Sequence, residues 1–84
     1  MPIYNFELLS KITDIEIIAV DSAIRRIDTL RKRYGGKRWR KLKGRAWVRL
    51  YNGEEYEAEI HFYDCNGIGI RELMIKLPED EDEE

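Results

Sequence analysis

The chain has 84 residues, which limits it to one domain with a modest core, since chains of this size bury about 60% of their unfolded surface. No apolar run reaches the roughly 20 residues of a membrane span, and the single cysteine, Cys65, excludes an internal disulfide. The net charge of −2 hides two blocks: residues 79–84 are all acidic, whereas twelve of the fifteen lysines and arginines lie between Arg25 and Arg49. The N-terminus lacks the pattern of a signal peptide, so we expect a cytoplasmic protein without a membrane partner.

The first 20 residues contain a segment of ambiguous secondary structure, followed by a predicted strand. Residues 2–12 alternate like a strand up to Leu8 but also contain a possible helical turn, so they form either an extra edge strand or a covering segment. Residues 14–20, DIEIIAV, are rich in β-branched side chains and predict a buried strand.

A short helix is predicted over residues 22–34. Asp21 and Ser22 supply an N-cap, apolar residues follow at helical spacing, and Gly35-Gly36 ends the helix. Residues 37–43, KRWRKLK, then form either a loop or one further helical turn.

The clearest element is a β-hairpin over residues 44–63, where apolar and polar side chains alternate on both sides of Asn52-Gly53. A two-residue turn would set apolar side chains opposite carboxylates, whereas a three-residue loop over residues 52–54 keeps the two faces apart. We therefore predict these pairs: Leu50 with Tyr56, Val48 with Ala58, Ala46 with Ile60, and Arg49 with Glu57.

A third strand is predicted over residues 70–77, after a turn-rich loop at 64–69, and Pro78 ends it. Matching the apolar faces places Leu73 beside Ile60 and Ile75 beside Ala58. A slip of two residues would keep these faces but change the neighbours. The opposite face then carries three rows: Arg45–His61–Glu72, Trp47–Glu59–Met74 and Arg49–Glu57–Lys76.

This order predicts an α+β fold, β-α-β-β-β, with one helix packed on a mainly antiparallel sheet of about four strands. Residues 1–78 form this single domain, and residues 79–84 form a disordered acidic tail. We expect the helix to cover the face that carries Ala46, Val48, Ile60 and Leu73, which leaves the three rows open to solvent or a partner.

The basic segment predicts contact with nucleic acid, most simply RNA. Clustered lysines and arginines neutralise phosphates, and Trp39 within the run can stack on an unpaired base. The alternative is a solvated basic face with Trp39 packed against the sheet. The candidate binding residues are Arg31, Lys32, Arg33, Lys37, Arg38, Trp39, Arg40, Lys41, Lys43 and Lys76.

The row of Arg45, His61 and Glu72 is a candidate catalytic site, with Tyr63 nearby. His61 is the only histidine, and a histidine beside a carboxylate can act as a general acid or base while an arginine stabilises phosphate charge. These parts suffice for metal-independent cleavage of RNA by its own 2′-hydroxyl. The alternative is a structural hydrogen bond between His61 and Glu72.

Two further features of the sequence concern a protein interface and metal binding. Trp47 and Met74 form an exposed apolar pair that predicts a protein interface or a homodimer, unless residues 2–12 fold back over them. Cys65 and His61 are close in sequence, but nothing completes a zinc set, so we predict neither a metal nor a cofactor.

The run WRKLKGRAWVRLYNGEEYEAEIHFYDCNGIGIRELMIKL resembles small bacterial proteins with a W-R-K-x-K-G…A-E-I-H-[WF]-Y-[ED]…G-I-G…K-I-K pattern, and its second half is similar to the terminal strands of bacterial toxin domains of the barnase/colicin/RelE-like ribonuclease fold. The likeness covers residues 20–77. It implies a helix before an antiparallel sheet and a toxin-type ribonuclease activity. The competing expectation is a non-catalytic regulator, inhibitor or antitoxin-like module that uses the open sheet face. The motif residues are Trp39, Lys43, Gly44, Glu59, His61, Tyr63, Gly67, Gly69 and Lys76.

Overall fold

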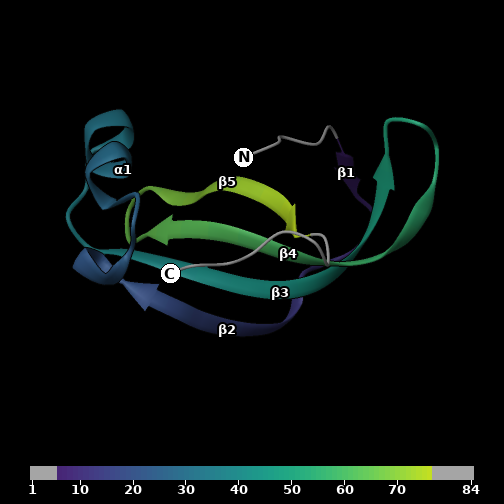
Figure 1. The fold of residues 1–84 in the computed structure, drawn as a ribbon, viewed down its shortest axis with the longest axis horizontal. Coiled ribbons are helices and arrows are strands. Elements are labelled where there is room, and N and C mark those ends of the chain that lie inside the picture. Colours follow the sequence, from purple (N-terminus) through teal and green to yellow (C-terminus); the bar gives the residue numbers. More distant parts are fainter. Residues whose placement is uncertain (1–5, 77–84) are drawn as a thin grey trace.

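The computed structural model describes residues 6–76, which form an antiparallel sheet of five strands with one α-helix (Figure 1). The predicted α+β class is confirmed, with one more strand than expected. The acidic tail at 79–84 lies outside the described residues. The elements are β1 (Phe6–Leu8), β2 (Thr13–Val20), a 3-10 turn (Asp21–Ala23), α1 (Ile27–Tyr34), β3 (Trp39–Leu50), β4 (Glu55–Cys65) and β5 (Gly69–Lys76).

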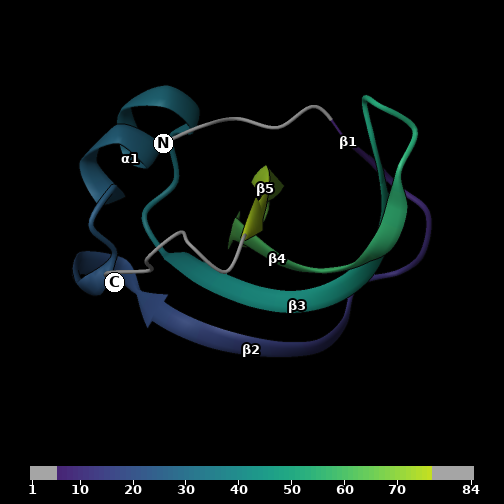
Figure 2. The same ribbon diagram turned by 45° about the vertical axis from the view of Figure 1, so that its right-hand side comes forward.

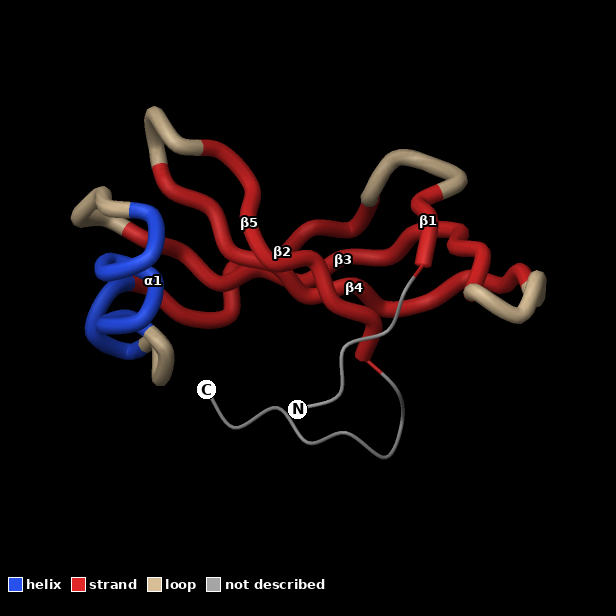
Figure 3. The backbone as a smooth tube through the Cα atoms, turned by 90° about the horizontal axis from the view of Figure 1, so that it is seen from above, coloured by secondary structure: helices blue, strands red, loops and turns tan. Residues whose placement is uncertain are grey.

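The sheet is organised around β3, which is 12 residues long. On one side β3 pairs with β1 near its C-terminal end and with β2 near its start, and on the other side it pairs with β4, which pairs with β5. Figure 2 shows the long strands curving together, with α1 at one end of the sheet, and Figure 3 shows β1 and the β3–β4 turn toward the other end. Residues 39–43, expected as a loop or helical turn, therefore begin β3.

The β3–β4 turn has the predicted odd length. Its three residues are 51–53: the Gly53 N–H donates to the Leu50 carbonyl at 2.9 Å, and the Leu50 N–H donates to the Glu54 carbonyl at 2.8 Å. Gly53 has a φ of 90°, the left-handed conformation that glycine supplies at the end of such a loop.

The register of this hairpin differs from the predicted one by two residues. The faces are unchanged, because side chains alternate and a slip of two keeps their direction. The predicted partners were wrong because the turn begins one residue earlier than expected. The observed pairs are Ala46 with Ala58, Val48 with Tyr56, and Arg49 with Glu55.

Strand β5 is also displaced by two residues, so Ile75 lies beside Ile60 and Met74 beside His61. One extra residue in β5 forms a bulge opposite Phe62, and Glu72 at this bulge has a φ of 58°. The three predicted rows, Arg45–His61–Glu72, Trp47–Glu59–Met74 and Arg49–Glu57–Lys76, are therefore wrong. The observed rows are Lys43–His61–Met74, Arg45–Glu59–Lys76 and the pair Trp47–Glu57.

The two faces of the sheet carry separate cores. The first contains the side chains expected to meet the helix, among them Ala46, Val48 and Ile60. Helix α1 packs instead on the other face, because the start of β3 and the end of β4 place large side chains there. This second core consists of Trp39, Tyr63 and Cys65 with Ala19, Ile24, Ile27 and Leu30.

Strand β2 was predicted to be buried, and it lies at an edge. Within the described residues its only partner is β3, so Ile15 and Ile17 are 52% and 54% exposed and only Ala19 is buried. Two bulges interrupt its ladder. Part of this irregularity has a local cause: a Cβ at Gly44 of β3 would lie 2.8 Å from the Thr13 carbonyl, so the two backbones approach closely there.

The helix begins five residues later than predicted. Ile24 is extended, with a φ of −80° and a ψ of 124°, and this interrupts the helical segment between the 3-10 turn and α1. The Asp21 side chain does not cap a helix; it accepts a hydrogen bond from the Trp39 N–H at 2.9 Å. Gly35, with a φ of 80°, ends α1 as expected.

Candidate nucleic-acid interface

The predicted catalytic residues are not brought together. His61 is only 4% exposed, and its Nε2 lies 2.6 Å from the Glu59 carboxylate, on the same face of β4. Arg45 forms an ion pair with Glu57 at 3.2 Å. The neighbour of His61 on β5 is Met74 and not Glu72, because the observed register of β5 differs from the predicted one by two residues.

Glu72 instead anchors the helix to the sheet. Its carboxylate accepts hydrogen bonds from Arg26 at 2.5 Å, from Arg33 at 2.6 Å and from Tyr34 at 3.0 Å. The bulge in β5 makes this possible, because the left-handed residue at position 72 directs its side chain toward α1. Glu72 therefore holds the orientation of α1, where an orienting contact with His61 was predicted.

Both aromatic residues of the predicted sites, Trp39 and Tyr63, are part of the core. Trp39 is 0% exposed, and its Nε1 donates to the Gly35 carbonyl at 3.1 Å, so the alternative of a packed tryptophan is confirmed. Tyr63 is 1% exposed and lies under Lys41, whose ammonium nitrogen is 5.8 Å from the ring centroid. Lys41 itself is only 5% exposed, so its charge faces the protein.

Trp47 and Met74 do not form an exposed pair. Trp47 is 51% exposed and lies opposite Glu57, whereas Met74 packs against the core beneath α1. Lys43 and Lys76 are half-buried in the middle of the sheet, in rows with His61 and Glu59.

Most arginines of the sheet are neutralised by carboxylates. Arg40 donates to Asp64 from Nε at 2.9 Å and from Nη2 at 2.6 Å, and Arg49 pairs with Glu7 and Glu55, each at 2.9 Å. The hydrogen bond that Arg40 donates to Asp64 raises the pKa of Arg40 above its ordinary value. Ion pairs therefore lie on both faces of the sheet, and they leave these arginines with little excess charge for a phosphate backbone.

Four exposed basic residues lie together at one end of the molecule, and we call them the basic patch: Arg31, Lys32, Lys37 and Arg38. The Arg31 guanidinium joins the end of α1 to the following loop, because it donates to the Lys37 carbonyl at 2.9 and 3.3 Å. None of the four forms an ion pair with a carboxylate among residues 6–76.

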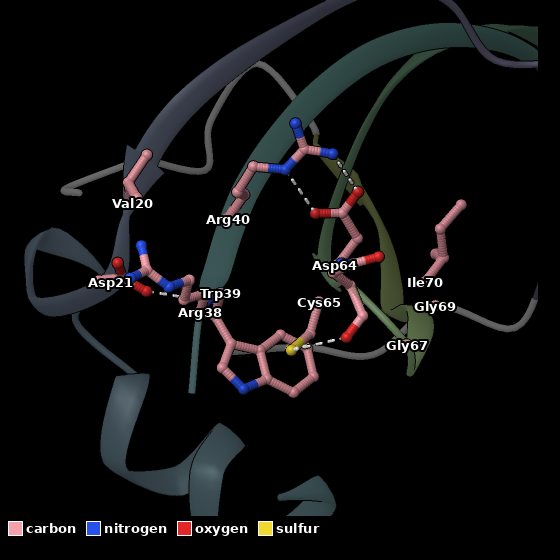
Figure 4. Close-up of a pocket in the computed structure, with 11 residues that line it drawn as sticks. Val20, Asp21, Arg38, Trp39, Arg40, Asp64, Cys65, Gly67, Gly69 and Ile70 are labelled. Atoms are coloured by element: carbon pink, nitrogen blue, oxygen red, sulfur yellow. Dashed lines mark hydrogen bonds and ion pairs between the residues drawn. The ribbon is translucent and has the colours of Figure 1, made fainter. Parts of the chain in front are cut away.

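A pocket of about 590 Å³ adjoins the basic patch, and we call it the end pocket (Figure 4). One row of side chains crosses four strands here, with the Arg40–Asp64 ion pair in the middle and Val20 and Ile70 on either side. Arg38 contributes to the wall and so connects the pocket with the patch. The remaining lining comes from Asp21, Trp39, Cys65, Asn66, Gly67 and Gly69.

Three of the binding residues predicted from the sequence line the end pocket, Arg38, Trp39 and Arg40, whereas Val20, Asp64 and Ile70 were missed. No local signal marks these three, because they belong to three different strand ends and meet only through the register. A smaller cavity of about 110 Å³ lies between Glu16, Lys43, Arg45 and Glu59. Within the described part of the chain, no cluster of three or more histidine, cysteine or carboxylate side chains is arranged to hold a metal ion.

Comparisons of the chain with family models, with curated proteins and with solved structures found no significant match. The resemblance to ribonuclease toxin domains therefore stays a prediction. In the described residues, no helix has the length and apolar character needed to cross a membrane.

Proposed function

We propose that this protein binds single-stranded RNA through the basic patch, without cleaving it. The observation that carries the proposal is the contrast in charge pairing. Three of the four arginines in the strands, Arg40, Arg45 and Arg49, pair with carboxylates, whereas Arg31, Lys32, Lys37 and Arg38 are exposed and have no carboxylate partner in the described residues. Exposed, unmatched cations release counterions when they contact phosphates, which drives nucleic-acid binding.

Binding without cleavage is proposed because the acid and base predicted from the sequence, His61 and Glu72, are both engaged elsewhere in the fold. His61, the only histidine, is buried and paired with Glu59, and Glu72 is engaged by two arginines and a tyrosine of the helical segment. A general base has to reach the 2′-hydroxyl whose proton it removes. His61 has no such access, since the residue is only 4% exposed.

Fluorescence anisotropy with a labelled oligouridylate of about 12 nucleotides tests the proposal, since single-strand-binding domains cover roughly 4–16 nucleotides. The double variant Lys37→Gln/Arg38→Gln should bind at least about tenfold more weakly, because two phosphate contacts are lost. The matched control is Arg45→Gln/Arg49→Gln, which removes the same charge from the paired surface. Equal weakening in both variants would mean that net charge alone matters, and would refute the patch as the binding site.

A second candidate is a protein-interaction module, and the observation that favours it is the edge strand β2. Ile15, Ile17 and Val20 are each about half exposed along an edge with no partner in the described residues. Exposed apolar edge strands are common sites of strand addition. Sedimentation of the protein alone tests the simplest case, self-association, which Ile17→Lys should abolish.

A further inference from the structure

We propose that the end pocket takes one unpaired nucleobase of the bound RNA, stacked on the Arg40–Asp64 ion pair, while Arg38 contacts a neighbouring phosphate. This inference rests on the proposed RNA binding, and it specifies which parts of the strand the protein contacts. The volume of about 590 Å³ lies within the range of roughly 300–1,000 Å³ that is typical of small-ligand sites.

The floor of the pocket is a preformed flat surface. Both nitrogens on one side of the Arg40 guanidinium donate to the two oxygens of Asp64, at 2.9 and 2.6 Å, so the guanidinium and the carboxylate hold each other in a fixed fork geometry. The Arg40 side chain remains 48% exposed, so the pair is accessible from the pocket. Splayed-out bases of single-stranded RNA stack on arginine planes of this kind, and a fixed platform loses little entropy when it binds.

The walls beside this platform are apolar and partly open. Val20 and Ile70, which flank the ion pair across β2 and β5, are 46% and 49% exposed. Figure 4 shows Val20 and Ile70 on opposite sides of the Arg40–Asp64 pair.

The charges of the pocket favour a base, and not a phosphate, on the Arg40–Asp64 ion pair. Asp64 neutralises Arg40, and its carboxylate would repel a phosphate placed directly on the pair. Arg38, in the wall, has no such partner among residues 6–76 and continues into the basic patch. A neutral, planar base on the platform and a phosphate on Arg38 therefore match the charges of the site.

The test compares two probes of equal charge and length: an oligouridylate and the corresponding abasic ribose-phosphate oligomer. The wild-type protein should bind the base-bearing strand about tenfold more tightly, as expected for the stacking of one base. The double variant Arg40→Gln/Asp64→Asn leaves the net charge unchanged and should lose this preference. The matched control Arg45→Gln/Glu57→Gln removes an ion pair elsewhere on β3 and β4 and should keep it.

The outcomes separate this inference from the function on which it rests. Equal binding of both strands by the wild type would overturn the base pocket and leave RNA binding by the patch in place, whereas no binding of either strand would overturn both. Should the double variant not fold, Ile70→Ser changes only a half-exposed side chain and should reduce the preference at least about twofold, since it removes one wall of the stack. A full preference in the folded pocket variants would place the base elsewhere and refute the assignment.

Discussion

The contact between buried His61 and partly exposed Glu59 makes the stability of the fold depend on pH. The hydrogen bond from His61 is the main cause that lowers the pKa of Glu59, with smaller contributions from the charges of Lys43 and Arg45. Because the folded-state pKa lies below the unfolded value of roughly 4.3, the contribution of the Glu59 carboxylate is fully present above that value. It is lost as the pH falls through the lowered folded-state pKa.

Glu59→Gln should therefore destabilise the protein at neutral pH and make little difference in acid. The Glu59 side chain is 38% exposed, so solvent screening limits the loss to about 1 kcal/mol. Urea unfolding at a series of pH values measures this, and the gap between the wild type and the variant should close below about pH 4. A gap that stays constant with pH would show that the charge of Glu59 contributes nothing.

Truncation of the two tryptophans should destabilise the protein to very different extents. Trp39 is 0% exposed and lies at the centre of the core beneath α1, so Trp39→Ala should cost about 3–5 kcal/mol through the cavity it leaves. Trp47 is 51% exposed, so Trp47→Ala serves as the control and should cost less than about 1 kcal/mol. Denaturant unfolding measures both, and similar losses would contradict the assignment of Trp39 to the core.

At the scale of the elements, one carboxylate secures the only α-helix of the described chain. Glu72 is 12% exposed at its side chain and accepts hydrogen bonds from Arg26, Arg33 and Tyr34. The helix has eight residues, which is too short to be stable in water by itself. Its packing on the sheet and this anchor therefore determine whether it forms.

Glu72→Gln keeps the size of the side chain but removes the charge that two arginines contact. We expect a loss of about 1–3 kcal/mol and faster hydrogen exchange at the amides of α1, because hydrogen bonds to charged groups are the stronger ones. Glu57→Gln is the matched control, since its ion pair with Arg45 is about half exposed. Unchanged exchange rates in α1 would show that apolar packing alone holds the helix.

At the scale of the whole molecule, the ion pairs of the sheet and the cations of the basic patch occupy different parts of the surface. Ion pairs lie along the sheet from β1 to β4, whereas four exposed cations without a carboxylate partner in the described residues lie together where α1 ends and β3 begins. Such sorting concentrates a positive field at one end even though the full chain has a net charge of −2.

The salt dependence of RNA binding should report this sorting. For single strands, the slope of log affinity against log salt falls by about 0.7 for each phosphate contact removed. Lys37→Gln/Arg38→Gln should therefore flatten the slope by about 1.4, whereas Arg45→Gln/Arg49→Gln should leave it within about 0.3 of the wild type. Anisotropy titrations over a range of salt concentrations measure both slopes, and equal flattening would indicate a diffuse field.

The sequence by itself determined the properties that depend on local periodicity. Alternation within residues 44–63 and 70–77 defined the strands and the two faces of each, because neighbouring side chains of a strand point in opposite directions. The odd length of the β3–β4 loop and the end of α1 at Gly35 also followed from local rules. These features together determined the α+β class.

Only the tertiary structure decided which side chains became neighbours across the sheet. Two registers that differ by two residues satisfy the same alternation, and the position of the turn at Gly53 and the bulge at Glu72 select between them. That choice separated His61 from Glu72. It also aligned Val20, Arg40, Asp64 and Ile70 at the end pocket. The large side chains at the start of β3 and the end of β4 put α1 on the face of Trp39. Cross-strand contacts join residues that are distant in sequence, so no local pattern encodes them.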